Sequence, residues 1–232
     1  MPKTARPPIA EWYCTYCGME LHRHGVSNKE HAVARQFFPE PRPVDLNKVV
    51  VPSCRTCNEA PKRDEDYVRG LLSLSRAALS DAGQRIHPVA MRALQKDRGL
   101  RDAIRRGLKR DVALRSPGGV YLGQAMTQTI AWDRVKRVLA KWARGLYFKE
   151  YGERLESSAT FDVALTPLEQ TREIVKPVQP SLGAWPGTFE YWHSRDDADR
   201  SRSRWAFLVW DAMGFIAVSN QPLDVLEVDV AP

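Results

Sequence analysis

The sequence has few cysteines and no long apolar segment. Only four of its 232 residues are cysteine. Apolar runs such as FLVW and FIAV are far shorter than the roughly 20 residues that a membrane-spanning helix requires. The N-terminal stretch MPKTARPPIAEW is basic and proline-rich but lacks the apolar segment of a secretory signal. Internal repeats, a nucleotide-binding glycine loop and low-complexity tracts are also missing. We therefore expect a cytoplasmic protein with no membrane partner and a loose N-terminal arm.

Acidic residues are in deficit relative to basic ones. The chain has 28 Asp and Glu against 35 Lys and Arg, which makes the formal net charge +7. Much of the excess lies between Arg85 and Lys149, where the stretches RDAIRRGLKR and RVKRVLAKWAR contain few acids. Such a distribution favours a polyanionic partner, either nucleic acid or an anionic surface. The alternative is an ordinary solvated helix surface.

The four cysteines form two matched pairs, Cys14-Thr-Tyr-Cys17 and Cys54-Arg-Thr-Cys57. Two intervening residues allow both sulfurs of a pair to reach one ion about 2.3 Å away, and two pairs supply the four thiolates of a tetrahedral zinc site. A redox site needs only one such pair, and structural disulfides are uncommon without a secretion signal. The pattern therefore favours a structural zinc ion over either alternative.

The segment between the two pairs contains side chains suited to catalysis. Glu30 and His31 are adjacent, Asn47 follows, and Asn58 comes directly after the last cysteine. The β-branched stretch NKVVVPS predicts a short strand before the second pair. After Asn58, apolar residues recur at helical spacing, and the acids DED at 64–66 are interpreted as stabilising the N-terminal end of that helix.

The ordered motifs CTYC, KEH, DLN and VPSCRTCN, with the lysine that follows, resemble the HNH endonuclease family over about residues 14–66. This resemblance implies a ββα-metal core of the treble-clef type. It also implies that His31 is the general base, that Glu30 is the acidic ligand of a catalytic metal ion, and that Asn47 fixes the loop carrying the base. Asn58 matches the second protein ligand of that metal. Because Asn58 stands where many members have histidine, the chain is similar to an H-N-N variant.

The chemistry of these residue types agrees with the implied roles. An unperturbed histidine has a pKa of about 6.5, so it can accept a proton from water near neutral pH. Carboxylate and amide oxygens suit Mg²⁺ or Mn²⁺. The implied reaction is metal-dependent hydrolysis of DNA phosphodiester bonds, which leaves 3′-hydroxyl and 5′-phosphate ends; RNA remains open as a substrate. Two non-catalytic alternatives also remain, a zinc-dependent nucleic-acid-binding protein on the same scaffold and a protein-interaction module.

A basic row accompanies the apolar positions of a helix predicted from Trp132 to Phe148. The apolar residues follow a 3.6-residue period, which predicts one packed face. We expect the basic row to follow a phosphate backbone, with Lys62 as a further candidate phosphate contact. The row consists of Arg134, Arg137, Lys141 and Arg144.

The whole chain predicts an α+β protein. Residues 67 to about 115 are expected to form helices, with a break near Ala82-Gly83 and an end at SPGG. After Gly152 the runs FDVAL, REIVKPV, GTFEYWHS, WAFLVW and FIAVS predict strands, the last two forming a hairpin. The expected parts are a zinc-stabilised HNH module at 1–68, a basic helical region at 69–152 and a β-rich C-terminal subdomain at 153–232.

Overall fold

The protein has a mixed α and β structure. The computed structural model describes residues 12–21, 28–175 and 185–223, so the N-terminal arm expected at residues 1–11 lies outside the described residues. Within this part of the chain, no helix is both long and apolar enough to cross a bilayer.

The N-terminal unit is a small strand-strand-helix arrangement. Strand β1 (Asn28–His31) pairs antiparallel with β2 (Val50–Ser53), with His31 opposite Val50. Helix α1 (Arg55–Glu59) follows β2 directly. The strand predicted from NKVVVPS occupies only its second half, because Leu46–Val49 form a 3-10 turn, η3, that buries Val49 in the core.

Three longer helices and a 3-10 turn follow. They are α2 (Lys62–Ser73), η4 (Arg76–Leu79), α3 (Asp81–Lys96) and α4 (Arg98–Gly107). The break expected near Ala82-Gly83 lies earlier, because the Ser80 side chain caps α3 by accepting the backbone N–H of Gly83 at 3.1 Å. Gly83 is needed there for a different reason: any Cβ at this position would collide with the backbone carbonyl of Ala77.

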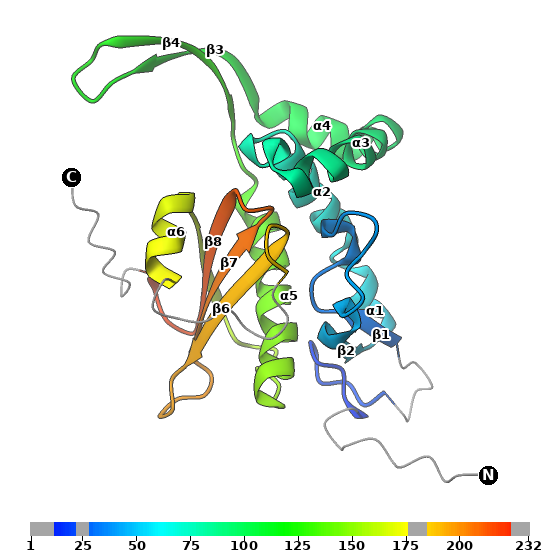
Figure 1. Cartoon of the computed structure of the whole chain (residues 1–232). Coiled ribbons are helices and arrows are strands. Elements are labelled where there is room, and N and C mark those ends of the chain that lie inside the picture. The colour runs from blue at the N-terminus through cyan, green and yellow to red at the C-terminus, as the bar shows by residue number, and fades with distance from the viewer. Residues whose placement is uncertain (1–11, 22–27, 176–184, 224–232) are drawn as a thin grey trace.

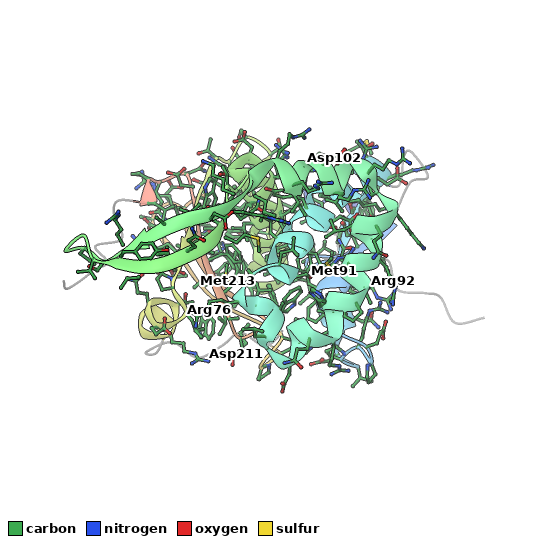
Figure 2. All side chains as sticks on the ribbon, turned by 90° about the horizontal axis from the view of Figure 1, so that it is seen from above. Arg76, Met91, Arg92, Asp102, Asp211 and Met213 are labelled. Atoms are coloured by element: carbon green, nitrogen blue, oxygen red, sulfur yellow. The ribbon has the colours of Figure 1, made fainter. Side chains whose placement is uncertain are left out.

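A long β-hairpin replaces the end of the expected helical region. Strands β3 (Leu108–Arg115) and β4 (Tyr121–Gln128) pair antiparallel. The helix prediction for residues 108–115 is therefore wrong: the SPGG segment reverses the chain between two strands, with Gly119 at φ +83°. Figures 1 and 2 show this hairpin extending away from the rest of the molecule.

Helix α5 (Trp132–Tyr151) packs against a four-stranded antiparallel sheet. The strands are β5 (Phe161–Thr166), β6 (Phe189–Arg195), β7 (Ser203–Val209) and β8 (Met213–Ser219), in the spatial order β5-β8-β7-β6. The predicted hairpin of β7 and β8 is present, with Val209 opposite Met213. The strand prediction for REIVKPV is wrong where the structure describes it, since Leu168–Val175 form helix α6.

Alternation along β7 explains why the sheet is apolar on both faces. Trp205 and Phe207 belong to the core shared with α5, whereas Ala206 and Leu208 belong to a separate cluster that Leu168 of α6 covers. The larger core continues into the N-terminal unit and into α2, α3 and α4. One hydrophobic core thus runs through all three expected parts, and α5 lies between the N-terminal unit and the sheet (Figure 1).

Candidate functional site

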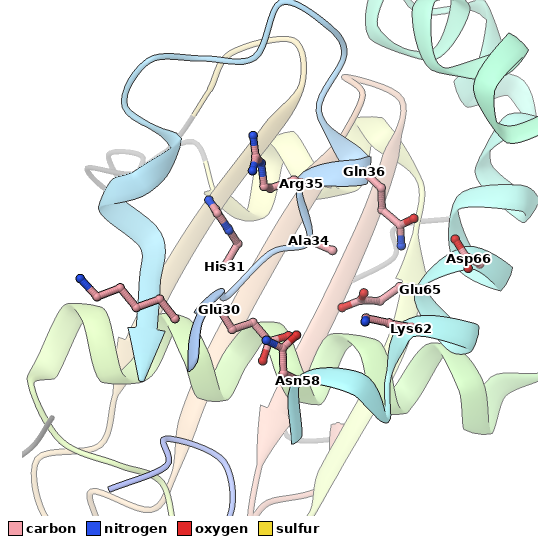
Figure 3. A pocket seen from close by; sticks show the side chains of 10 residues that line it. Glu30, His31, Ala34, Arg35, Gln36, Asn58, Lys62, Glu65 and Asp66 are labelled. Atoms are coloured by element: carbon pink, nitrogen blue, oxygen red, sulfur yellow. The ribbon is translucent and has the colours of Figure 1, made fainter. Parts of the chain in front are cut away.

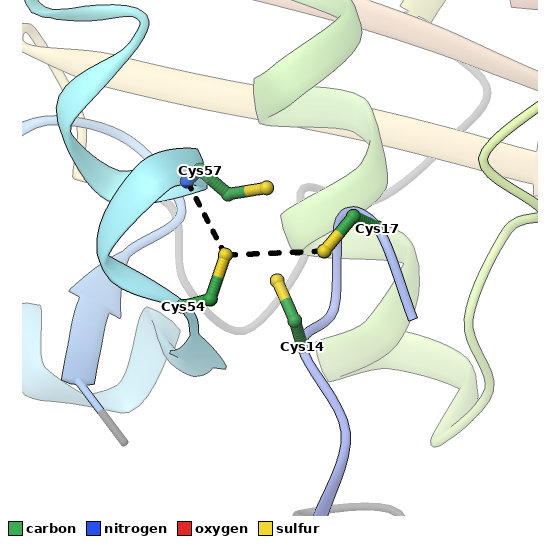
Figure 4. A group of neighbouring side chains, drawn as sticks. All are labelled: Cys14, Cys17, Cys54 and Cys57. Atoms are coloured by element: carbon green, nitrogen blue, oxygen red, sulfur yellow. Dashed lines mark hydrogen bonds between the residues drawn. The ribbon is translucent and has the colours of Figure 1, made fainter. Parts of the chain in front are cut away.

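The four cysteines lie together, as the sequence predicts. Their Sγ atoms are all within 4.8 Å of one another, and the Cys17 and Cys54 sulfurs are 3.8 Å apart (Figure 4). A zinc ion with four bonds of about 2.3 Å to tetrahedral sulfurs would separate those sulfurs by about 3.8 Å. All four cysteines are free of disulfides. The arrangement can hold a zinc ion.

Local backbone geometry forms each half of this cluster. In the first pair, the N–H of Cys14 donates to the carbonyl of Met19 at 2.8 Å, and the N–H of Gly18 donates to the carbonyl of Cys14 at 2.9 Å. Gly18 has φ +77°, a conformation that favours glycine. In the second pair, Cys54 caps α1, and its sulfur accepts the N–H of Cys57 at 3.4 Å. The cluster therefore ties the Cys14–Cys17 turn to the start of α1.

A pocket of about 350 Å³ opens beside β1. Glu30 and His31 both line it, although adjacent residues of a strand project to opposite sides. Asn58 from α1 and Lys62 and Glu65 from α2 complete this part of the lining (Figure 3). Residues from two helices and a strand therefore line one pocket.

His31 is held in a state suited to accepting a proton. Its Nε2 lies 3.3 Å from Oδ1 of Asn47. Because an amide oxygen can only accept, Nε2 carries the hydrogen in this contact and Nδ1 is left unprotonated. Burial lowers the pKa of His31; the Asn47 contact opposes this shift, while the charges of Arg35 and Arg42 add to it. The imidazole is therefore neutral near pH 7.

Glu30 is a buried carboxylate with an unfilled hydrogen-bonding capacity. Its exposed fraction is 6%, and its Oε1 forms an ion pair with Lys141 of α5. The other oxygen, Oε2, accepts no hydrogen bond from any described residue. Burial raises the pKa of Glu30, although the charge of Lys141 opposes that shift. Asn58 lines the same pocket as Glu30.

Glu65 is a member of this site that the sequence interpretation missed. Its predicted place at the N-terminal end of a helix is confirmed, because Glu65 lies in the first turn of α2. The structure also buries its side chain, and Nζ of Lys141 lies 2.5 Å from its Oε1. A signal for this was present in the sequence. Glu65 stands three residues before Val68 and seven before Leu72, so it shares their buried face of α2. Two carboxylates, Glu30 and Glu65, thus face one ammonium group.

The basic row on α5 does not form the continuous free surface that we expected. Arg134 and Arg137 each donate from Nε to one oxygen of Asp64 in α2, both at 2.7 Å. Arg134 also lies over the ring of Tyr67, 4.6 Å from its centroid. These two arginines therefore hold α5 against α2, and of the pair only Arg137 keeps more than half of its side chain exposed, at 59%.

The remaining two members of the row also face inward. Lys141 is buried between Glu30 and Glu65, so the expectation that it contacts phosphate is wrong. Arg144 donates to backbone carbonyls at 156–159 and lies over the ring of Phe161. The helical period correctly predicts that all four residues share one side of α5. That side is not free, because it packs against β1, α2 and the segment after α5. Lys62 is exposed and remains available for a phosphate contact.

No protein-family model matches the chain, and no curated protein or solved structure shows significant similarity to it. The resemblance of residues 14–66 to HNH endonucleases therefore rests on the sequence motifs. The clustered cysteines are compatible with that resemblance.

Proposed function

We propose that the protein is a metal-dependent HNH endonuclease that hydrolyses DNA phosphodiester bonds and leaves 3′-hydroxyl and 5′-phosphate ends. One observation carries the proposal. Glu30 and His31 are adjacent on a strand that is followed by a second strand and a helix, and that helix brings Asn58 to the same pocket. A general base and two oxygen donors for a cation thus line one pocket of about 350 Å³, with His31 and Glu30 on opposite sides of β1 (Figure 3).

In this mechanism His31 takes a proton from the attacking water. Its lowered pKa keeps the imidazole neutral at physiological pH, so the base is present in its active form. The Asn47 contact selects the tautomer and fixes the direction of Nδ1. Asn47 therefore acts as a positioning residue for the base.

Glu30 and Asn58 are the residues that would hold the catalytic cation. The oxygen Oε2 of Glu30 lacks a donor among the described residues, and a bound Mg²⁺ or Mn²⁺ would satisfy it. Such an ion supplies Lewis-acid stabilisation of the charge that develops on the phosphate and on the departing 3′ oxygen. Lys62, exposed at the rim of the pocket, is placed to contact a phosphate.

The cysteine cluster has a structural part in this proposal. A zinc ion held there would fix α1 to the turn at Cys14–Cys17, and α1 carries Asn58. The four sulfurs saturate a tetrahedral ion, which leaves no open coordination position for a substrate. Zinc therefore orients the site, and the chemistry belongs to the pocket beside β1.

A second candidate function has an observation in its favour. Glu30 is already paired with Lys141, and a carboxylate neutralised in this way binds a cation less readily. This pairing favours a non-catalytic, zinc-dependent nucleic-acid-binding protein on the same scaffold. The catalytic candidate is preferred because Glu30, a neutral His31 and Asn58 line the same pocket, which a protein that only binds does not require.

A cleavage assay with supercoiled plasmid and a panel of divalent metals tests the proposal. We expect the wild-type protein to nick the plasmid with Mg²⁺ or Mn²⁺. His31→Ala should lower the rate by about 10² to 10⁴, because it removes general-base catalysis. A matched control is His87→Ala, which removes an imidazole that does not line the pocket and contacts the carbonyl of Ser73 instead. If His31→Ala cuts as fast as wild type while a chelator blocks the wild-type reaction, the assignment of this site is wrong.

The dependence of activity on metal concentration distinguishes the role of Glu30 from that of His31. Glu30→Gln should weaken the catalytic ion, so activity lost at low Mg²⁺ or Mn²⁺ should return in part as the metal is raised. No metal concentration should rescue His31→Ala. Glu59→Gln, an exposed substitution on α1 outside the pocket, is the control for the loss of one carboxylate. Equal metal dependence of Glu30→Gln and wild type would remove Glu30 from the cation site.

A further inference from the structure

Unpaired basic side chains gather on α4 and on the strand that follows it. Leu100 and Ile104 form the buried face of α4, and Arg98 and Arg105 lie on the opposite, exposed face. Lys109 and Arg110 continue this exposed basic surface at the start of β3. Its acidic neighbours within α4 and β3 are Asp102 and Asp111.

This surface differs from the basic row of α5 in the state of its charges. Arg134, Arg137 and Lys141 are held by carboxylates of α2 and β1. Among the described residues, no ion pair involves the basic side chains of α4 or β3. An unpaired, solvated row of Lys and Arg is the form in which proteins neutralise phosphates.

The hairpin of β3 and β4 is exposed on both faces. Tyr121 is 54% exposed, Leu122 is 65% exposed and Met126 is 60% exposed. A two-stranded hairpin without a covered face is marginally stable in water. The outer part of this hairpin, which Figure 2 shows extending beyond the body, therefore gains stability when a partner covers it.

The two strands of the hairpin differ in chemistry. Strand β3 carries Lys109, Arg110 and Arg115, whereas β4 (YLGQAMTQ) has no charged residue. Exposed Gln124 and Thr127 on β4 present uncharged donors and acceptors. Basic side chains neutralise phosphates, and uncharged polar side chains such as Gln and Thr can read base edges, as Arg and Lys also do. A two-stranded ribbon of this kind fits the major groove, which is about 12 Å wide.

The basic surface also continues to the Glu30-His31 pocket. A second pocket, of about 350 Å³, is lined by the charged residues Arg63, Asp66, Asp97, Arg106 and Arg134. Asp66 lines both pockets, so the two adjoin. Asp66 of α2 thus lies between the basic surface of α4 and the pocket where cleavage is proposed.

We propose that α4 and the β3–β4 hairpin form the surface that binds duplex DNA, with the hairpin in the major groove and α4 along the phosphates. The identity of the ligand rests on the proposed nuclease function, but the binding surface is tested without catalysis. A second copy of this chain is the competing occupant of the hairpin, because its tip is apolar. Charge complementarity favours DNA, since the base of the hairpin and α4 are both basic.

Fluorescence anisotropy with a labelled duplex, in the cleavage-deficient His31→Ala background and without added divalent metal, tests this surface. The double variant Lys109→Gln/Arg110→Gln should make the slope of log affinity against log salt less steep by about 1.8. This value is the sum of about 0.9 for each of the two phosphate contacts removed. At 0.1 M salt this corresponds to binding that is about tenfold to a hundredfold weaker. The matched control is Lys149→Gln/Arg204→Gln. It removes two exposed charges outside the proposed surface, one in the last turn of α5 and one on β7.

Equal salt slopes for the two double variants would overturn the proposal. It would also be overturned if the wild type is a dimer in solution that Leu122→Asp dissociates without any change in DNA affinity, because the hairpin would then join two copies. These outcomes are distinct from failure of the nuclease proposal. A protein that binds duplex through Lys109 and Arg110 but never cuts it retains this surface and loses only the proposed chemistry.

Discussion

At the scale of single residues, Lys141 lies between two buried carboxylates. Its ammonium group contacts both Glu30 and Glu65, and the side chains of all three are at most 8% exposed. Removing one partner from a buried ion pair leaves an uncompensated charge, which costs more than the pair itself contributes. Lys141 therefore stabilises the same carboxylate that the proposed function assigns to the cation.

Lys141→Met should consequently destabilise the protein by about 3 to 5 kcal/mol, measured from urea unfolding curves. Lys136→Met, on the same helix with an exposed partner, should cost less than about 1 kcal/mol. Adding Glu65→Gln to Lys141→Met should recover part of the loss, since one buried charge is removed. Equal costs for Lys141→Met and Lys136→Met would show that the buried pairs do not form.

At the scale of elements, two clamps set the position of the site. Asp64 near the start of α2 receives Arg134 and Arg137 from α5. The cysteine cluster ties the Cys14–Cys17 turn to α1. Because α1 and α2 carry Asn58 and Glu65, both clamps act on the geometry of the pocket.

The Asp64 clamp should make stability depend on pH in the acid range. Burial alone would raise the pKa of Asp64, but hydrogen bonds from Arg137 and Arg134 outweigh it and hold the pKa below its ordinary value. A depressed carboxyl pKa contributes stability above the unfolded value of about 3.9, and that stability is lost as pH falls through the folded pKa.

We therefore expect Asp64→Asn to be less stable than wild type at pH 7, and the difference to shrink as pH falls below about 4. The urea unfolding midpoints of both proteins between pH 2.5 and 7 measure this difference in stability. Asp162→Asn, which removes an exposed partner of Lys136 at 3.6 Å, is the control and should show little difference at any pH. A constant gap between Asp64→Asn and wild type across this range would contradict the clamp.

The cysteine clamp predicts one zinc ion per chain by elemental analysis. Cys54→Ser should lose the ion and, in hydrogen exchange, the protection of β1, β2 and α1, because zinc binding contributes on the order of 10 kcal/mol to folding such small units. The control is Thr56→Ser, an exposed position between Cys54 and Cys57, which should retain both the zinc ion and the protection. Folded protein that contains no zinc would contradict the assignment.

At the scale of the whole molecule, Trp142 of α5 joins the parts of the fold. Its ring makes edge contacts with Phe37 at 5.0 Å, Phe189 at 5.3 Å and Phe207 at 5.7 Å between centroids. Phe37 belongs to the N-terminal unit and the other two to the C-terminal sheet. The two units therefore share one core across α5.

Trp142→Ala should cost about 3 to 5 kcal/mol, as large-to-small changes of buried aromatics do. It should lower the unfolding midpoints of the N-terminal unit and of the sheet together. Hydrogen exchange at increasing denaturant concentrations measures both midpoints. Trp132→Ala, at the exposed start of α5, should cost much less. A sheet that keeps its midpoint while the N-terminal unit unfolds would show that the parts are independent.

Features with local causes were predictable. The span of α5 follows from a 3.6-residue period, and the β7–β8 hairpin from two apolar runs around a short turn. The prediction failed at β3, where LKRDVALR has no clear period and pairs with β4 only because SPGG reverses the chain. It failed again at α6, whose β-branched residues fold as a helix where Leu168 covers the sheet.

By itself, the sequence determined the chemistry available to this protein: two Cys-X-X-Cys pairs, an adjacent Glu-His pair and an excess of basic residues. These depend on spacing over a few residues, which the covalent chain sets directly. Only the tertiary structure decided which charges are free. Lys141 meets Glu65, 76 residues away, and Arg137 meets Asp64, 73 residues away, while the arginines of α4 meet no carboxylate among the described residues. The physical reason is that the helical period places a basic row on one side of α5, whereas the packing of β1 and α2 determines whether that side faces water or buried acids.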